Sequence, residues 1–417
     1  VDGDIRLSFG ETYAAARALA GGLVEGHKLQ KGDRVGIAAR NSANWIIAYM
    51  AIIMAGGVAT LLNGWWQGGE LAEGIRMVGC RYVLADEQRA ARLAGHDIGG
   101  CELLIFGHDG APMEGLAVLT SKGGGAETPL PTLEPTDNAT ILYTSGSTGQ
   151  SKGAVSDHRA VVQGAMSYVG QTLVFFELLS STGQAMPAQP SALVNVPLFH
   201  VTASIPLVLQ SFAIGRKLVL MPKWDAEEAM RIIEKERISY FVGVPLMSIE
   251  LATHPNRHKY DLTSCTAFAA GGAPRPVEHV KKIRKEMSWG YPLLGYGLTE
   301  TAAPSHTNPP DAPKQQCLGI PFLSTDARIV DPETLQELPQ GESGEIVIHG
   351  PEVFNGYWKR PDATAAAFFE LEGKRFFRSG DLGRVDEDGY FFITDRLKRM
   401  INASGFKVWP AEVEALM

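Results

Sequence analysis

The sequence has few cysteines and no excess of positive charge, and both shortages exclude classes of protein. Its four cysteines, Cys80, Cys101, Cys265 and Cys317, lie far apart, with no CxxC pair and no run of cysteine and histidine ligands. This spacing predicts a reduced, cytoplasmic protein without structural zinc. The formal net charge is −8, from 46 acidic and 38 basic residues. We therefore expect no nucleic-acid partner, and any anionic ligand must be held by a local site.

A continuous hydrophobic segment that could cross a membrane is also missing. The one run of sufficient length, 45–62, is divided by Gly56 and Gly57 into a helical part, 42–55, and a strand, 58–62. We expect a buried helix, a turn and a buried strand there, and no transmembrane segment. The opening VDGDIRLSFG is polar, which is not typical of a secretory signal, and it lacks an initiator methionine, which indicates a trimmed start.

The order of apolar runs predicts an α/β fold. With 417 residues and 45% hydrophobic content, the chain can bury several cores. Up to about residue 290, strand-like runs alternate with helical ones, which is typical of parallel sheets covered by helices. The predicted strand and helix pairs are 34–39 with 42–55, 82–85 with 87–93, 217–221 with 226–236, and 240–243 with 246–252. Residues 110–136 and 305–316 are rich in turn-forming residues and are expected to be loops.

The last quarter of the chain has a different pattern. Between about 318 and 395, short β-rich runs are separated by turn signals such as Asp331-Pro332, Gly341 and Asp388-Gly389. This spacing predicts an antiparallel, barrel-like subdomain. Further on, Pro410 followed by Ala411 and Glu412 predicts the start of a helix, and we expect it to open a further domain.

A glycine- and hydroxyl-rich segment, YTSGSTGQSKG at 143–153, directly follows the strand-like run ATILYT. Glycines let the backbone approach anionic oxygens, while hydroxyls and a lysine add donors and positive charge. The composition also fits a flexible linker, but linkers rarely follow a strand and seldom end in lysine. A Walker A loop needs GxxxxGK[ST], which is absent. We predict a loop that binds a nucleotide's polyphosphate through Thr144, Ser145, Gly146, Ser147, Thr148, Gly149 and Lys152.

Four motifs together resemble the adenylate-forming superfamily, which includes acyl-CoA synthetases, aryl-CoA ligases, luciferases and peptide-synthetase adenylation domains. They are YTSGSTGQSKG at 143–153, GYGLTET at 295–301, RSGDLG at 378–383 and DRLKRMINASGFKVWPAEVE at 395–414. The resemblance implies that residues 1–397 form the large N-terminal domain, with two parallel-type sheets and the β-rich subdomain. It also implies a hinge at Lys398 and a truncated start of the small C-terminal domain over 398–417. The family's catalytic lysine of that small domain would lie outside this sequence.

The resemblance assigns the phosphates and the metal to specific residues. Thr299 would bond the α-phosphate, and Glu300, with Thr144, would hold Mg²⁺. A hard cation that keeps its waters does favour a carboxylate beside phosphate oxygens. Taken in isolation, the heptapeptide GYGLTET would more simply indicate a core tyrosine on a glycine-rich turn beside a solvated glutamate.

The resemblance also assigns the nucleoside. Tyr296 would stack on adenine, which suits an aromatic face, and the nearby backbone would come from Gly271, Gly272, Ala273 and Gly297. Asp381, expected in a turn, and Arg396 would bind the ribose hydroxyls. Outside this context Arg396 would be interpreted as a surface cation. Asp386 and Asp388 are expected to be solvated turn residues and not ligands.

The segment VPLFH at 196–200 matches the family's aromatic segment at the acyl site. Amino-acid-activating members place aspartate after the phenylalanine, so His200 in that position argues against a peptide-synthetase role. A histidine in an apolar run is more often a satisfied core residue, although its ring would also suit positioning of a carboxylate. The remaining pocket is expected to be apolar and mostly small. It would comprise Phe199, Val244, Pro245, Met247, Ala269, Ala270, Gly271, Gly295, Leu298, Ala302 and Ala303.

The resemblance implies an AMP-forming acid–CoA ligase. Because Asn63-Gly64-Trp65-Trp66 resembles fatty-acyl-CoA synthetases, the expected substrate is a medium- or long-chain fatty acid. It would be converted to acyl-AMP and pyrophosphate and then to acyl-CoA, with ATP, Mg²⁺ and CoA as ligands and a homodimer as a compatible assembly. An aryl-CoA ligase of coumarate or benzoate type is one alternative. A non-catalytic nucleotide- or acyl-binding member is the other, since Ser151 stands where the family usually has proline, and serine leaves the loop less rigid.

Overall fold

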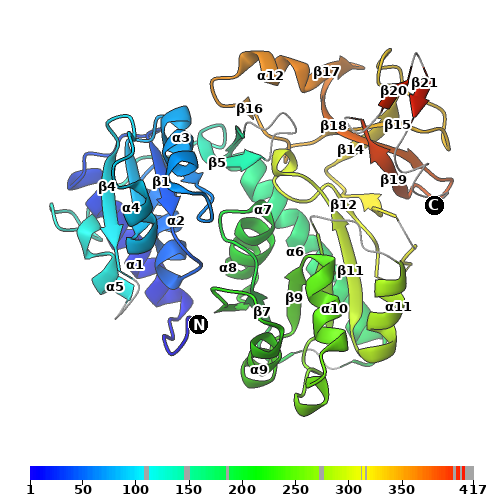
Figure 1. Ribbon diagram of the computed structural model, residues 1–417, viewed down its shortest axis with the longest axis horizontal. Helices are drawn as coiled ribbons and strands as arrows, with labels where there is room; N and C mark the ends of the chain where they lie inside the picture. The colour runs from blue at the N-terminus through cyan, green and yellow to red at the C-terminus, as the bar shows by residue number, and fades with distance from the viewer. Residues whose placement is uncertain are drawn as a thin grey trace.

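The computed structural model describes residues 1–107, 112–144, 151–184, 187–271, 277–310, 312–314, 317–397, 401–403 and 406–408. Over these residues the chain forms two seven-stranded sheets, a five-stranded antiparallel sheet and a two-stranded hairpin. The two large sheets stand side by side with their helices, and the antiparallel sheet lies at one end of them (Figure 1). This arrangement confirms the predicted fold class.

The first sheet has the strand order β16-β6-β5-β2-β1-β3-β4. Strands β1 to β5 run parallel, β6 pairs antiparallel with β5, and β16 pairs antiparallel with β6. Its strands are β1 (Arg34–Ala38), β2 (Val58–Leu61), β3 (Tyr82–Asp86), β4 (Glu102–Phe106), β5 (Asn138–Thr144), β6 (Lys152–Asp157) and β16 (Gly356–Tyr357). Apolar residues of helices α3 (Gly68–Val78) and α4 (Glu87–Leu93) cover one face, and those of α1 (Phe9–Glu25) and α2 (Ala43–Met54) cover the other.

The second sheet has the order β13-β12-β11-β10-β9-β7-β8 and is parallel from β8 to β11. Its strands are β7 (Ser191–Val194), β8 (Lys217–Leu220), β9 (Tyr240–Gly243), β10 (Ala267–Ala270), β11 (Tyr291–Tyr296), β12 (His306–Thr307) and β13 (Ile320–Pro321). One face packs against α9 (Ala226–Glu236), α10 (Pro245–Thr253) and α11 (Val277–Glu286). The other packs against α6 (His158–Ser181), the π-helical segment η2 (Ser204–Leu209) and α8 (Gln210–Ile214).

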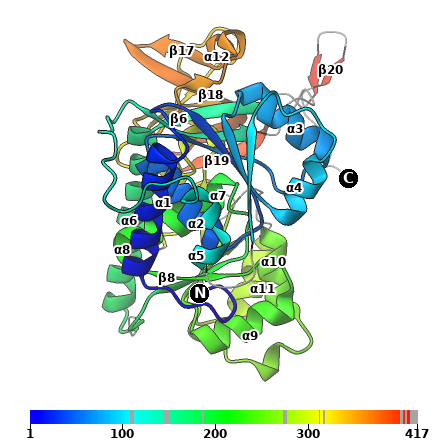
Figure 2. The same ribbon diagram turned by 90° about the vertical axis from the view of Figure 1, so that its left-hand side faces the viewer.

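The two sheets share one hydrophobic core. Trp45 and Ile47 of α2 belong to the same cluster of buried residues as Phe175 of α6 and Val194 and Val242 of the second sheet. The helical layer between the sheets is visible from two directions in Figures 1 and 2. Burial of apolar surface on both sides of this layer holds the sheets in a fixed relation.

The C-terminal part forms the expected antiparallel subdomain, a curled sheet in which β14, β15, β18 and β17 are neighbours and β19 pairs with β18. The strands are β14 (Asp326–Val330), β15 (Gly344–His349), β17 (Phe368–Leu371), β18 (Lys374–Val385) and β19 (Phe391–Arg396). The remaining elements are α5 (Pro112–Gly115), η1 (Ala117–Leu119), α7 (Val201–Ala203), η3 (Arg257–Lys259), η4 (Thr299–Thr301), α12 (Pro361–Ala366), β20 (Ile401–Ala403) and β21 (Phe406–Val408).

Three local expectations differ from the structure. The predicted loop at 305–316 includes β12, because this short strand pairs with the end of β11. The predicted loop at 110–136 includes α5 and η1. Asp381 is not in a turn: it lies within β18, which continues past an irregularity in its pairing with β15. Lys398 and the helix expected from Pro410 fall outside the described residues.

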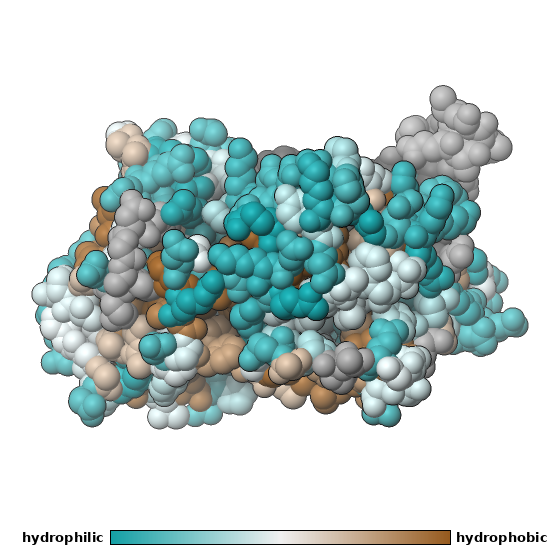
Figure 3. All heavy atoms as spheres, turned by 90° about the horizontal axis from the view of Figure 1, so that it is seen from below, coloured by the Kyte–Doolittle hydropathy of each residue, from teal (hydrophilic) through white to brown (hydrophobic). Residues whose placement is uncertain are grey.

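No described helix is long and apolar enough to span a membrane. The hydrophobic run that raised the question is α2, a turn and β2, and all three are largely buried, as the sequence predicts. Figure 3 shows the surface from below, where hydrophilic residues alternate with smaller hydrophobic patches.

Candidate functional site

A cavity of about 1130 Å³ opens at the carboxyl ends of the parallel strands, where the two large sheets meet the antiparallel subdomain. Its wall includes the ends of β5, β10 and β11 together with parts of β18 and β19. In open α/β sheets ligands bind outside the carboxyl ends of the strands, since the loops that follow them can carry varied side chains without disturbing the core. The cavity is therefore the candidate site.

The hairpin of β5 and β6 brings Thr144 and Lys152 to the cavity. These two residues are paired across the strands and both line the cavity wall. The Nζ atom of Lys152 lies 4.8 Å from the centre of the Tyr357 ring, a cation–π contact. The predicted phosphate-binding residues between them, Ser145 to Gly149, lie outside the described residues.

Glu300 is 9% exposed and lines the same cavity. The Tyr357 hydroxyl donates a hydrogen bond of 2.7 Å to Glu300 Oε1. Burial raises the pKa of Glu300 above its ordinary value, while Tyr357 and the nearby positive charge of Lys152 act against this rise. Tyr357 thus connects the lysine and the carboxylate, and Thr299, on the same short helix as Glu300, also faces the cavity.

Asp381 joins the two residues that were predicted to hold the nucleoside. The Tyr296 hydroxyl donates to Asp381 Oδ2 over 2.7 Å, and Arg396 Nε lies 2.9 Å from Oδ1. Asp381 is 1% exposed, and burial raises its pKa despite the opposing effect of Arg396. Asp381 and Arg396 meet because they are register partners in β18 and β19. Since each carboxylate oxygen has two acceptor positions, both oxygens can still accept from a ligand hydroxyl.

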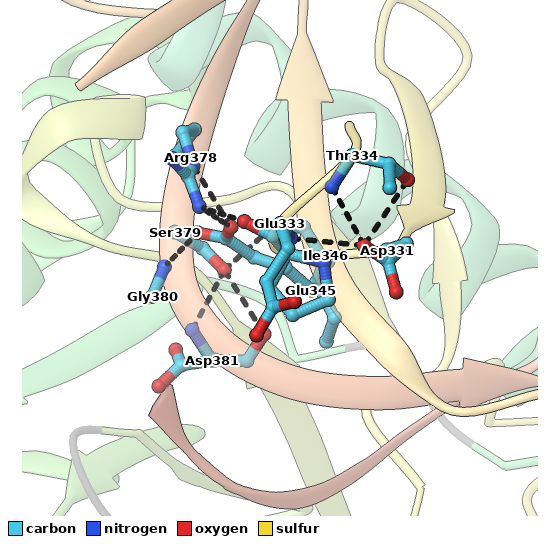
Figure 4. A network of polar contacts seen from close by, with 10 residues as sticks. Asp331, Glu333, Thr334, Glu345, Ile346, Arg378, Ser379, Gly380 and Asp381 are labelled. Carbon is cyan, nitrogen blue, oxygen red and sulfur yellow. Dashed lines mark hydrogen bonds and ion pairs between the residues drawn. The ribbon is translucent and has the colours of Figure 1, made fainter. Parts of the chain in front are cut away.

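A polar network behind Asp381 fixes the bend of β18 (Figure 4). The buried Glu345 accepts hydrogen bonds from the Arg378 guanidinium, at 2.6 and 2.9 Å, and from the Gly380 N–H at 3.1 Å. Ser379 Oγ donates to the Ile346 carbonyl at 2.6 Å and accepts from the Asp381 N–H at 3.0 Å. Gly380 has a φ of 72°, in the left-handed region. The network holds the Asp381 backbone at the cavity wall.

Small residues allow a close chain crossing beside Tyr296. A Cβ on Gly297 would lie 1.4 Å from the Ala303 carbonyl oxygen, so only glycine fits there. Gly271 and Gly295 line the cavity as well. The predicted Gly272 and Ala273 are outside the described residues. On its far side, the Tyr296 ring packs at 5.5 Å against the ring of buried His306, whose pKa burial lowers to about 3.

The residues expected to contact the acid divide into two groups. Phe199, His200, Ala269, Ala270, Leu298 and Ala303 line the cavity. Val244, Pro245, Met247 and Ala302 do not: the first three are at the start of α10, where Val244 is exposed and Met247 packs into the second core, and Ala302 is buried beside Gly164. Strand β9 ends at Gly243, and the chain turns into α10 on the opposite face of the sheet, which removes these side chains from the cavity.

His200 is not a satisfied core residue. It is exposed, lines the cavity and caps α7, with Nδ1 accepting from the Thr202 N–H at 3.2 Å. Although the side chain reaches solvent, the cavity walls around it partly desolvate the ring, and this lowers the pKa of His200 and favours the neutral form. Next to it, the Phe199 ring contacts the Trp65 ring edge-on at 5.5 Å, so the 63–66 segment also reaches this part of the cavity.

Sequence reasoning missed several residues of the site. Tyr357 and Glu345 carry polar contacts, and Tyr168, Gln171 and Tyr240 extend its wall. A tyrosine after a glycine has no distinctive spacing, and neither has an acid in a β-strand, so no sequence signal pointed to these two residues. Their contacts depend on strands that are far apart in the chain. Ser379 is part of the RSGDLG motif, but its role was not predicted.

Comparison with known proteins identifies the family. Residues 1–358 match the family model described as "AMP-binding enzyme". The chain is 30% identical to the long-chain-fatty-acid–CoA ligase of Bacillus subtilis (strain 168), over 98% of this chain and 75% of that protein. It is 29% identical to 4-coumarate–CoA ligase 2 of Oryza sativa subsp. japonica, over 98% and 73%. The crystal structure of ATP-bound MatB from Rhodopseudomonas palustris superimposes with a TM-score of 0.85 at 28% identity, covering 99% of this chain and 78% of that one.

The sheets, the curled subdomain and the cavity between them have the arrangement of the large domain of adenylate-forming enzymes. The chain belongs to the AMP-binding enzyme family and is an AMP-forming acid–CoA ligase.

Proposed function

We propose that this ligase activates an aliphatic carboxylic acid of medium or longer chain and transfers the acyl group from acyl-AMP to CoA. The observation that carries the proposal is the placement of Lys152 and of the buried carboxylates of Glu300 and Asp381 around a single cavity that continues into an apolar wall. Lys152, Glu300 and Asp381 all line it, and Tyr357 and Tyr296 orient the two acids.

The nucleotide site follows from these contacts. Tyr296 offers an aromatic face to adenine, while Asp381 and Arg396 accept and donate hydrogen bonds to the ribose hydroxyls. Lys152 and Thr144 bind the phosphates together with the loop between them, and Thr299 bonds the α-phosphate. The buried carboxylates keep acceptor positions open to the cavity beside their protein partners, and a nucleotide with its cation would fill them.

Glu300 suits a magnesium ion. Among the described residues no cluster of three or more histidine, cysteine or acidic side chains that could hold a metal occurs. Mg²⁺, however, usually binds through one or two carboxylates plus substrate phosphates and water. Glu300 Oε1 is fixed by Tyr357, and no described side chain is hydrogen-bonded to Oε2. When bound, Mg²⁺ neutralises charge on the triphosphate.

The chemistry is an in-line displacement. A carboxylate oxygen of the acid attacks the α-phosphorus, the bond from that phosphorus to the bridging oxygen breaks, and pyrophosphate leaves. The CoA thiol then attacks the acyl carbonyl, its proton is released, and AMP leaves. Positioning and electrostatic stabilisation carry such steps, which fits a site with a lysine and oriented dipoles and no protein nucleophile. Residues 398–417 would act as the hinge and the start of the small domain.

The acid would lie beside Phe199 and His200 and between α6 and the second sheet. A release assay for pyrophosphate over aliphatic acids of increasing length and over coumarate and benzoate tests this choice in the full-length protein. We expect the highest kcat/KM for an aliphatic acid. A preference for the aryl acids would overturn the choice of substrate. Absence of acid-dependent exchange of labelled pyrophosphate into ATP would indicate a non-catalytic member and overturn the activity itself.

A further inference from the structure

A second, smaller cavity of about 40 Å³ continues the site into the interior between α6 and the second sheet. Tyr168, Gln171, Tyr240 and Leu293 line both cavities, so the two are adjacent. The large cavity is at the carboxyl ends of the strands, whereas the small one reaches Ser239 and the starts of β9 and β10. A chain of atoms that starts beside His200 and follows α6 inward would therefore end at the small cavity.

Arg216 forms part of the wall of the small cavity and is 2% exposed. Its Nε donates to Ser211 Oγ at 2.8 Å, and its Nη2 donates to Gln210 Oε1 at 3.0 Å and to the Pro206 carbonyl at 2.5 Å. Its guanidinium carbon lies 4.7 Å from the centre of the Tyr240 ring. All of these partners are neutral, and no described residue is hydrogen-bonded to Nη1.

No described carboxylate forms an ion pair with Arg216, whereas Arg89, the other buried arginine of the described residues, contacts Asp86 at 2.9 Å. Burial lowers the pKa of Arg216 to about 10, so the guanidinium remains charged at neutral pH. A buried charge without a counterion is costly in free energy, and proteins rarely keep one unless a bound ligand supplies the opposite charge. An arginine also presents its donors in a planar fork that matches a carboxylate.

We propose that the acid substrate carries a second carboxylate at the far end of its aliphatic chain and that Arg216 binds this group through Nη1. The inference rests on the proposed function, which it narrows to α,ω-dicarboxylic acids. The small cavity has room for roughly two or three water molecules, or for one carboxylate in their place. Because both ends of the substrate are fixed, the enzyme should prefer one chain length sharply. An open apolar channel would instead accept a range of chain lengths.

The test compares three acids at each chain length, from about four to about sixteen carbons. They are a dicarboxylic acid, its monomethyl ester and the monocarboxylic acid. Pyrophosphate release by the full-length protein is measured. We expect one dicarboxylic acid to exceed its own half-ester by about tenfold or more in kcat/KM, mainly through KM, since the half-ester keeps the shape and loses the distal charge.

Variants assign the preference to Arg216. Arg216→Gln should lower the ratio of diacid to half-ester about tenfold, Arg216→Lys should retain part of it, and Arg231→Gln, an exposed arginine of α9, should leave it unchanged. Thermal melting checks that each variant is folded. The preference of the unaltered protein for a diacid over its half-ester tests the inference even if a variant does not fold. Equal use of diacids and half-esters at every length would overturn the inference alone. No pyrophosphate release with any acid would overturn the proposed function as well.

Discussion

Glu300, the proposed magnesium ligand, shows how burial and two neighbours together set the charge state of one side chain. Desolvation raises its pKa, and the Tyr357 hydroxyl and the Lys152 charge limit that rise. A carboxylate must be ionised to hold a divalent cation, so burial moves the loss of the charged form of Glu300, the proposed metal ligand, to a higher pH than in an exposed glutamate.

This balance predicts a pH dependence of MgATP binding. The folded-state pKa of Glu300 is above its ordinary value of 4.5, so protonation removes the metal ligand as pH falls through that raised value. We expect the affinity for MgATP, measured by calorimetry from neutral pH downward, to decline at a pH above 4.5. Glu300→Gln should bind MgATP weakly and without that transition. An unchanged transition in the variant would show that another group controls it.

Tyr357 should set where the transition falls. Tyr357→Phe removes the hydrogen bond that stabilises the ionised carboxylate, and a hydrogen bond to a charged group is worth about 1.5 kcal/mol or more. The midpoint of MgATP binding should therefore move to higher pH by about one pH unit. Tyr13→Phe, at an exposed tyrosine of α1, is the matched control and should leave the midpoint in place. If Tyr357→Phe and Tyr13→Phe had the same pH midpoint of MgATP binding, the role of Tyr357 would be refuted.

At the level of elements, the bend of β18 places Asp381. The strand leaves its register with β15, Gly380 takes a left-handed conformation, and Glu345 and Ser379 bond the backbone on either side. Asp381 then reaches both Tyr296 of the second sheet and Arg396 of β19. The bend therefore positions a residue that connects the second sheet to the antiparallel sheet at the cavity.

Two glycines of β18 and its preceding turn provide a matched test of the bend. Gly380 has a φ of 72° and Gly373 a φ of 73°, and a Cβ at either position would meet nothing within 4 Å. Alanine at either should cost about 1–2 kcal/mol of unfolding free energy through backbone strain alone. Only Gly380→Ala should also weaken ATP binding, by about tenfold, because relief of the strain displaces Asp381. Equal ATP affinity in the two variants, measured by calorimetry, would contradict the proposed role of the bend.

At the level of the whole molecule, the two sheets are joined by buried polar contacts as well as by the shared core. Asn41, after β1 of the first sheet, donates to the Val196 carbonyl and accepts from the Leu198 N–H, both at 2.9 Å, in the segment that follows β7 of the second sheet. Leu198 directly precedes Phe199 and His200 at the acid side of the cavity. The relation between the sheets therefore also sets the position of the acid site.

Asn41→Ala should affect stability and substrate binding together. It leaves two buried backbone groups unpaired, which costs roughly 2–4 kcal/mol. The KM for the acid should rise several-fold, while ATP affinity should stay the same because the nucleotide residues lie elsewhere on the wall. Asn44→Ala is the control: it removes a bond to the Gly107 carbonyl next to the first sheet and should lower stability alone. Denaturant unfolding and steady-state kinetics measure both effects, and an unchanged KM in Asn41→Ala would refute the coupling.

The sequence was sufficient for the α/β class, for the approximate bounds of the strands and helices that it named, and for the parts of the site that follow a strand. Strand β9, helices α4 and α9, and the Tyr296–Glu300 segment needed only periodicity, caps and motif order, which are local properties. Val244, Pro245 and Met247 were expected at the cavity because they follow β9 directly, but the chain turns to the other face there. Local pattern does not report the direction in which a chain leaves a sheet.

Periodicity and residue chemistry were enough to predict helix-covered parallel sheets and a phosphate-binding loop, since hydrophobic spacing and glycine–lysine loops act over a few residues. The pairing of Tyr357 with Glu300, the meeting of Tyr296, Asp381 and Arg396, and the buried Arg216 beside the inner cavity arose from folding. Each joins segments brought together by strand register or helix packing, and such long-range contacts follow from the free energy of the whole fold and not from any one segment.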